Sequence, residues 1–213
     1  MNTTTRKTQE RALATQQAIL DAALEEFSRV GFEGASLRRI ADLAEVNHRL
    51  IQHHFGSKLG LWKATASTTI EKFHAHLERR LAGLEGVSEA ESLRLLFREF
   101  ILYSASVPQL NNFMLQANDE PERMRWLVET LLTPSKHLLI NGLERAQVLG
   151  ICAEGDPKLL WYIFAGAATS IFAFHEEFEQ VTGFSPHNET VLNSHIETVL
   201  GLFFPTLPEE EKS

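Results

Sequence analysis

The stretch from Ala35 to Leu61 constrains the fold most, because it contains two short helical patterns separated by a tight turn. In the first pattern, apolar residues recur at the spacing of one helix face. They are Leu37, Ile40, Ala41 and Ala44. The second pattern follows Asn47, a residue type that caps the N-termini of helices. We therefore expect two short helices that pack against each other across the turn.

The second of these helices has polar and apolar side chains on opposite faces. Its donor-rich side consists of His48, Arg49, Gln52 and His53. Ile51 and Phe55 lie on the other side, and Ser57 is placed to cap a third helix. A short helix with an apolar back and a donor-rich front is typical of a helix that reads the major groove of DNA.

Residues 15–62 resemble the DNA-binding domain of the tetracycline-repressor (TetR) family. The resemblance rests on a first helix, TQQAILDAALEEFSRVGF, on the two short helices, and on the run HHFGSK that leads into a long helix. It implies a transcriptional repressor that a small molecule releases from a palindromic operator. It also implies DNA contacts by Ser36, Arg38, Arg39, Asn47, His48, Arg49, Gln52, His53, His54 and Lys58.

Four positions depart from the usual pattern of that family. Glu45 stands where a turn glycine is usual, and would cost about 1–2 kcal/mol if the backbone there is left-handed. Arg49 replaces a glycine, Leu50 a small hydroxyl residue, and Gln52 a tyrosine that touches the DNA backbone. Arg49 is the side chain that we expect to reach a guanine. On a helical wheel, His54 lies between Leu50 and Ile51, so its side chain either packs against the protein or binds DNA.

The chain is predicted to have four parts. They are a flexible basic arm (1–14), the DNA-binding domain (15–62), a ligand-binding and dimerisation domain (63–205) and an acidic tail (206–213). The first part is either a frayed end or an arm that reaches phosphates or a minor groove. The first helix is expected from near Thr15 to Val30, with Gly31 left-handed and Phe32 folded back on Phe27.

The fold class is predicted to be all-α with nine or ten helices, since no stretch alternates as a strand does. Phe27, Ile40, Ile51, Phe55 and Leu61 are expected to form the core of the DNA-binding part. Pro134 should interrupt a helix, which then continues to Leu149. Asp156-Pro157 should open the helix after it, and Ser185-Pro186 the last one. The uncharged run of residues 159–174 is shorter than the about 20 residues that cross a bilayer.

Charge and cysteine content narrow the class of protein further. The net charge of −8 argues against a general nucleic-acid coat. Residues 1–62 carry eight Lys and Arg against seven Asp and Glu, while the rest carries 12 against 21, so the acid is kept away from the proposed DNA end. The single cysteine, Cys152, excludes an internal disulfide, and with no signal peptide in view it suggests the cytoplasm.

The resemblance implies two further surfaces. One is a homodimer interface on the last two helices, predicted from Ala165, Ala168, Phe172, Leu192, Ile196, Val199 and Phe203. The alternative is that the apolar helix of residues 159–174 is simply the central core helix. The other surface is a cavity for an apolar or aromatic ligand, predicted from Phe97, Phe100, Tyr103, Phe113, Met114, Trp126, Trp161 and Phe164. For any one of these side chains, core packing is the competing role.

Two other classes of function compete with that of a DNA-binding regulator. An enzyme is disfavoured because the sequence has no nucleophile elbow, phosphate-binding loop, zinc-protease motif or dinucleotide-binding turn. A zinc site at His48, His53 and His54 lacks a second ligand cluster, so no metal or cofactor is expected. A helical adaptor that keeps the two short helices only as a scaffold gains some support from Glu45, Leu50 and Gln52.

Overall fold

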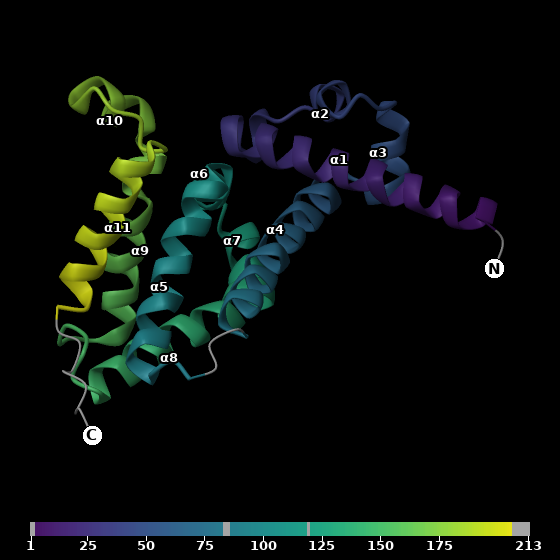
Figure 1. Cartoon of the computed structure of the whole chain (residues 1–213). Helices are drawn as coiled ribbons and strands as arrows, with labels where there is room; N and C mark the ends of the chain where they lie inside the picture. The colour runs from purple at the N-terminus through teal and green to yellow at the C-terminus, as the bar shows by residue number, and fades with distance from the viewer. Residues whose placement is uncertain (1–2, 83–85, 119, 206–213) are drawn as a thin grey trace. The chain divides into compact units, whose positions relative to one another are not determined.

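The computed structural model describes residues 3–82, 86–118 and 120–205, and this part of the chain is helical without a strand. The all-α prediction is confirmed, but the described residues form eleven α-helices rather than nine or ten (Figure 1). The first seven are α1 (Thr3–Gly34), α2 (Leu37–Leu43), α3 (His48–Phe55), α4 (Lys58–Leu81), α5 (Glu89–Ser106), α6 (Pro108–Ala117) and α7 (Pro121–Leu127). A π-helical turn (Val128–Leu132) leads to α8 (Thr133–Val148), α9 (Pro157–Ala173), α10 (His175–Thr182) and α11 (Glu189–Phe203).

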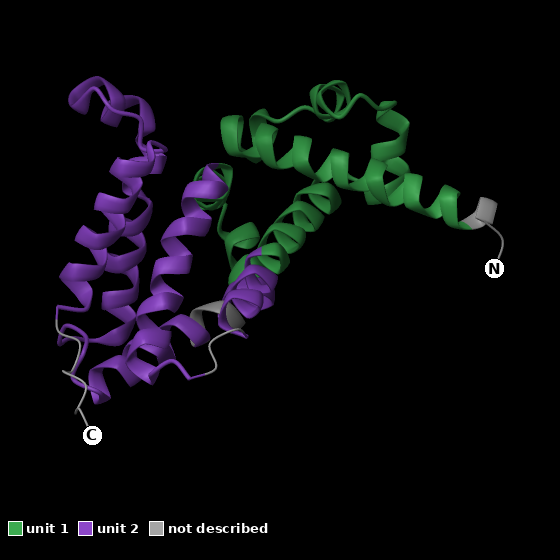
Figure 2. Cartoon of the chain, viewed as in Figure 1, with its two compact units in different colours: residues 1–72, 109–128 green, residues 73–108, 129–213 purple. Residues whose placement is uncertain are grey.

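The chain forms two compact units, which Figure 2 colours separately. The first comprises residues 1–72 and 109–128, so it contains α1 to α3, most of α4, and α6 and α7. The second comprises residues 73–108 and 129–213, and contains α5 and α8 to α11. The division of the chain into four parts stays a prediction, and the acidic tail of residues 206–213 lies outside the described residues.

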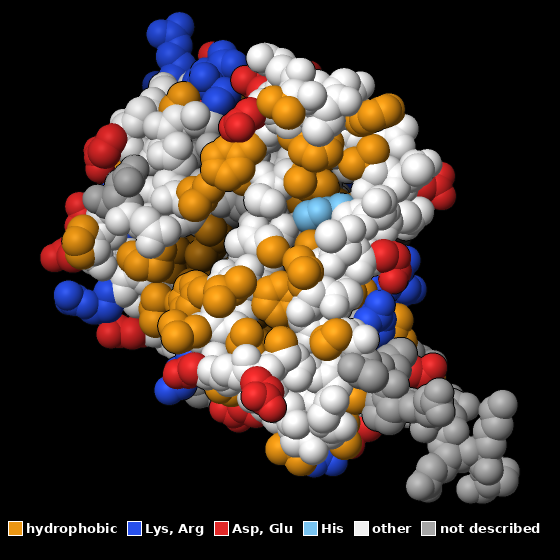
Figure 3. Space-filling view, turned by 90° about the vertical axis from the view of Figure 1, so that its left-hand side faces the viewer, with side chains coloured by type: hydrophobic (Ala, Val, Ile, Leu, Met, Phe, Trp, Pro, Cys, Tyr) orange, Lys and Arg blue, Asp and Glu red, His pale blue; other side chains and the backbone are white. Residues whose placement is uncertain are grey.

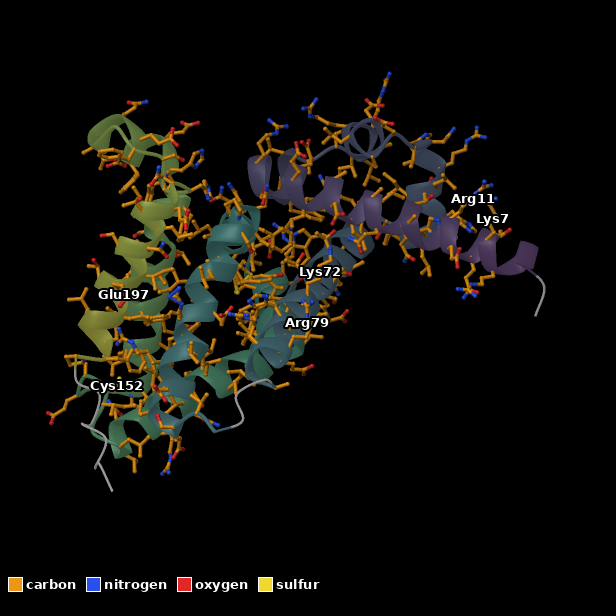
Figure 4. The ribbon with its side chains drawn as sticks, viewed as in Figure 1. Lys7, Arg11, Lys72, Arg79, Cys152 and Glu197 are labelled. Carbon is orange, nitrogen blue, oxygen red and sulfur yellow. The ribbon has the colours of Figure 1, made fainter. Side chains whose placement is uncertain are left out.

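The first helix begins at Thr3, not near Thr15 as the sequence suggested. Residues 3–14 contain no glycine or proline, and an Arg6–Glu10 ion pair of 2.9 Å one turn apart supports the helix. The described side chains of these turns, among them Lys7 and Arg11, are exposed (Figure 4). Amphipathic periodicity could not reveal this extension, because it has no buried face.

The end of the first helix follows the prediction. Gly31 has φ 70°, which breaks the regular helix at a residue type that adopts positive φ without strain. Phe32 then folds back, and its ring lies 6.0 Å from that of Phe27. The turn therefore directs the chain towards α2 and packs the half-buried ring of Phe32 on the buried ring of Phe27.

The core of the first unit contains most of the residues predicted for it. Phe27, Ile40, Ile51 and Leu61 are buried, whereas Phe55 is only half-buried, so its assignment to the core was wrong. Phe55 is the last residue of α3, and the chain leaves the core at Gly56. The remaining space is filled from α4 and α6, where Trp62 stacks on Phe113 at 5.3 Å.

In the second unit, the side chain of Asp156 caps the start of α9, the helix that the sequence predicted there, and the side chain of Ser88 caps the start of α5. The start of the last helix was predicted wrongly. The helix begins at Glu189, and not at Ser185-Pro186. Asn188 accepts hydrogen bonds from the backbone N–H groups of both Thr190 and Val191, which makes it the effective cap. The separate helix α10 was not predicted. Among the described residues no single helix is long and apolar enough to cross a membrane, although α9 and α10 together, bent by 71°, meet the same criteria.

Candidate DNA-binding site

The site is built on two short helices whose starts are fixed by side-chain caps. The hydroxyl of Ser36 accepts a hydrogen bond from the backbone N–H of Arg39 at 3.5 Å. The amide oxygen of Asn47 accepts one from the backbone N–H of Arg49 at 2.9 Å. Behind these caps, Ile40 on α2 and Ile51 on α3 are fully buried. The apolar back of α3 therefore anchors the helix and leaves its other face to solvent.

The front of α3 presents hydrogen-bond donors to solvent. His48, Arg49, Gln52 and His53 are all exposed. Within the described part of the chain, no side chain pairs with the Arg49 guanidinium, so its fork of N–H groups is available for a base or phosphate. His54 is half-buried against the Phe55 ring, which favours the packing role that the sequence left open.

The neighbouring cations differ in how they are held. Arg38 is exposed. Arg39 lies 3.4 Å from a carboxylate oxygen of Glu26, a buried residue of α1 that also pairs with Arg29 at 2.7 Å. Arg39 thus ties α2 to α1, although much of its side chain remains exposed. If Arg39 contacts DNA as predicted, it must do so while its guanidinium is paired with Glu26.

Lys58 joins the start of α4 to the end of α1. Its Nζ donates to the backbone oxygen of Glu33 at 3.1 Å and lies 4.8 Å from the centre of the Phe32 ring. The Ser57 hydroxyl accepts from the backbone N–H of Gly60 at 3.0 Å, as predicted for the cap of this helix. The helix N-terminus still favours a phosphate nearby, since its macrodipole places partial positive charge there.

The turn between the two short helices contains the strained residue that the sequence indicated. Glu45 has φ 54°, and it is the non-glycine residue with positive φ in the described chain. We expect Glu45→Gly to raise the free energy of unfolding by about 1 kcal/mol, because glycine adopts this conformation without the clash at Cβ. Urea unfolding followed by circular dichroism measures the change, and a destabilised variant would contradict it.

The predicted ligand-binding residues fall into two groups. Phe113, Met114 and Trp126 belong to the first unit, and the other five belong to the second. In the second unit, the rings of Phe97 and Phe100 lie 5.0 Å and 5.8 Å from that of Phe164, and Trp161 lies 5.1 Å from Phe100. Rings at these separations are in direct contact, so this group has the geometry of a packed core.

The predicted interface residues lie mostly inside the chain, which corrects their assignment to a surface. Ala168, Phe172, Ile196, Val199 and Phe203 are buried within the second unit, while Ala165 and Leu192 are half-buried. The exposed apolar side chains of α9 and α11 are instead Leu159, Tyr162, Ile163 and Leu202. The sequence does indicate that α9 has a second apolar face. The helix is apolar on every side, and the core of one chain covers only one of these sides.

Cys152 is a free cysteine that is half-buried. Burial raises the pKa of its thiol, so the fraction present as thiolate is lowered. In the described chain no group of three or more His, Cys, Asp or Glu side chains has the arrangement of a metal site.

A capped helix, a tight turn and a second helix with an exposed, donor-rich face are the parts of a helix-turn-helix DNA-binding protein. Residues 19–65 match the family described as bacterial regulatory proteins, tetR family. The regulator RutR of Escherichia coli K12 is 29% identical over 200 residues, which cover 92% of each chain. The regulatory protein RaaS of Mycobacterium tuberculosis is 44% identical over 63 residues, covering 30% of this chain and 29% of that protein.

A solved structure shows the same fold over most of the chain. AibR in complex with isovaleryl coenzyme A and operator DNA has a TM-score of 0.72 and 19% identity, and the match covers 91% of this chain and 100% of AibR. The chain is thus similar to the tetR family of bacterial regulatory proteins in its helix-turn-helix segment, and to a solved regulator in the fold of most of its length.

Proposed function

We propose that this protein is a sequence-specific transcriptional repressor of the cytoplasm, which binds a palindromic operator as a homodimer and is released by a small molecule. The observation that carries the proposal is the front of α3, where His48, Arg49, Gln52 and His53 are exposed while Ile51 fixes the back of the helix. Each protomer has one such helix, so two protomers would read half-sites about 34–36 Å apart. The related regulators RutR and RaaS support a role in transcription.

Arg49 is the residue that we expect to specify a base. Its replacement by alanine should weaken binding by about 1–3 kcal/mol and relax sequence preference at one position of each half-site, because a bidentate contact to guanine is lost. The measurement is the affinity for a duplex selected from a random-sequence pool with the wild-type protein, and for its single-base variants.

Arg38→Ala is the matched control for this experiment, because it removes the same charge from an exposed position on the neighbouring helix α2. It should weaken all duplexes alike and reduce the salt dependence by about one phosphate contact. An Arg49→Ala variant with unchanged sequence preference would remove Arg49 from the base-reading residues.

The dimer is proposed to form through the outward faces of α9 and α11. Leu159, Tyr162 and Ile163 on α9 and Leu202 on α11 expose apolar side chains that the chain's own core leaves uncovered. These residues replace the buried set named from the sequence. Gly166 and Gly201, both exposed, lie on the same two helices and would allow close approach of the partner's backbone.

The ligand is proposed to be a small molecule with a substantial apolar part. AibR was solved with isovaleryl coenzyme A, which supports a small-molecule effector for a protein of this fold. The aromatic group of Phe97, Phe100, Tyr103, Trp161 and Phe164 is the proposed contact region. Because these rings pack on one another, a ligand would have to displace some of them. The test is crystallisation from cell extract and a search for trapped density beside these rings.

A further inference from the structure

The short helix α10 connects α9 to α11 and buries none of its residues. It starts at His175, directly after α9, and ends at Gly183, whose φ of 75° closes the helix. In Figure 1 it forms a separate turn of chain at the joint between the two long helices. A helix of this length gains little stability in isolation, so packing against another surface is the usual reason for one to form.

Large apolar side chains on and beside α10 face solvent. Phe174 is 61% exposed, Val181 77% and Phe184 61%. They are interspersed with three exposed acidic residues, Glu176, Glu177 and Glu179. Single exposed apolar residues are common on protein surfaces, but three within eleven positions form a patch that needs a cover.

The base of this segment is held firmly, so its exposure is not that of a loose end. Pro186 is buried, and the His187 ring stacks on Phe172 of α9 at 5.7 Å with an angle of 28° between the planes. Asn188 then caps α11. The chain therefore fixes where α10 is attached while leaving its apolar side chains uncovered.

The patch begins where the outward apolar face of α9 ends. Leu159, Tyr162 and Ile163 project from α9, and Phe174 follows at the end of the same helix. Figure 3 shows hydrophobic side chains gathered over this side of the second unit. The interface proposed on α9 and α11 therefore lies next to the exposed apolar residues of the α10 segment along the chain.

We propose that α10, with Phe174 and Phe184 beside it, is an arm that packs against a second copy of this chain and extends the dimer interface beyond α9 and α11. The proposal rests on the homodimer proposed above. A second copy fits better than an anionic membrane or DNA, because Glu176, Glu177 and Glu179 would repel both. In a two-fold dimer the same arm is present twice, so each residue contributes on both sides.

The test compares the dimer dissociation constants of full-length variants by analytical ultracentrifugation. Val181→Asp and Phe184→Asp place a charge in the arm, and Val148→Asp is the matched control. Val148 is 74% exposed at the end of α8, so its exposure is close to that of Val181 and its chemical change is the same. We expect the dissociation constant to rise about tenfold or more in both arm variants and to stay at the wild-type value in the control.

The possible results separate this proposal from the one on which it rests. If the wild type is a monomer, the proposed dimer is wrong and the arm with it. If the wild type is a dimer and both Val181→Asp and Phe184→Asp dimerise as it does, only the arm is wrong. Binding of the wild type to vesicles of phosphatidylcholine and phosphatidylglycerol, lost in Val181→Asp, would assign the patch to a lipid surface and also overturn the proposal.

Discussion

Replacing Phe27 with alanine is expected to lower the free energy of unfolding of the DNA-binding unit by about 3–5 kcal/mol. Phe27 is 1% exposed, and its ring contacts those of Phe32 at 6.0 Å and Phe113 at 6.4 Å. Truncation removes these contacts and leaves a cavity that the surrounding helices cannot close fully. Because the total stability of a domain is of similar size, DNA binding at moderate temperature should be lost with it.

Phe55→Ala is the matched control for that variant. It removes the same ring from the same unit, but Phe55 is half-buried at the end of α3, so a much smaller loss is expected. Urea unfolding followed by circular dichroism measures both. An equal loss in the free energy of unfolding for Phe27→Ala and Phe55→Ala would mean that the burial of Phe27 is not what stabilises this unit.

The second large effect is expected from Ile163→Asp. Ile163 is 60% exposed on the outward face of α9, so the free protomer should fold normally. In the proposed dimer the new carboxylate would be buried without a partner, which costs several kcal/mol per ion. The variant should therefore be monomeric at micromolar concentration. Its affinity for operator DNA should fall about a hundredfold or more, because two linked reading helices bind far more tightly than one.

Analytical ultracentrifugation and fluorescence anisotropy with the selected duplex measure these two quantities. Leu115→Asp is a control in the first unit, since Leu115 is also exposed and lies on α6, outside the proposed interface. An Ile163→Asp protein that remained dimeric would move the interface to another face. A monomer with undiminished affinity would show that dimerisation is not required for DNA binding.

Local signals in the sequence predicted the DNA-binding part in detail. Asn47 caps the helix that it was expected to cap, Gly31 has the positive φ expected of it, and Glu45 has the left-handed backbone that was considered for its place in the turn. These features depend on short-range geometry, which a few neighbouring residues determine. The identity of the DNA-contacting side chains stays a prediction, because their partner is not part of the chain.

Longer-range features were harder to predict, and each failure has a physical cause. The apolar residues of α9 surround the helix, so periodicity could not decide whether Phe172 or Ile163 faces the chain's own core. The exposed start of α1 has no apolar stripe that periodicity could detect. At the start of α11 the sequence offers two candidate caps, and the structure uses Asn188 rather than Ser185. The short helix α10 has no buried residue, so no apolar stripe in the sequence could reveal it.

The central claim is that two copies of α3, held by a dimer, read one palindromic site. A footprint on the selected duplex, combined with the stoichiometry of binding at several salt concentrations, tests it most directly. We expect two protomers per site, protection of two half-sites about one helical turn apart, and affinity that falls steeply with salt. A single protomer on an asymmetric footprint, or no salt-dependent binding to any selected duplex, would contradict it.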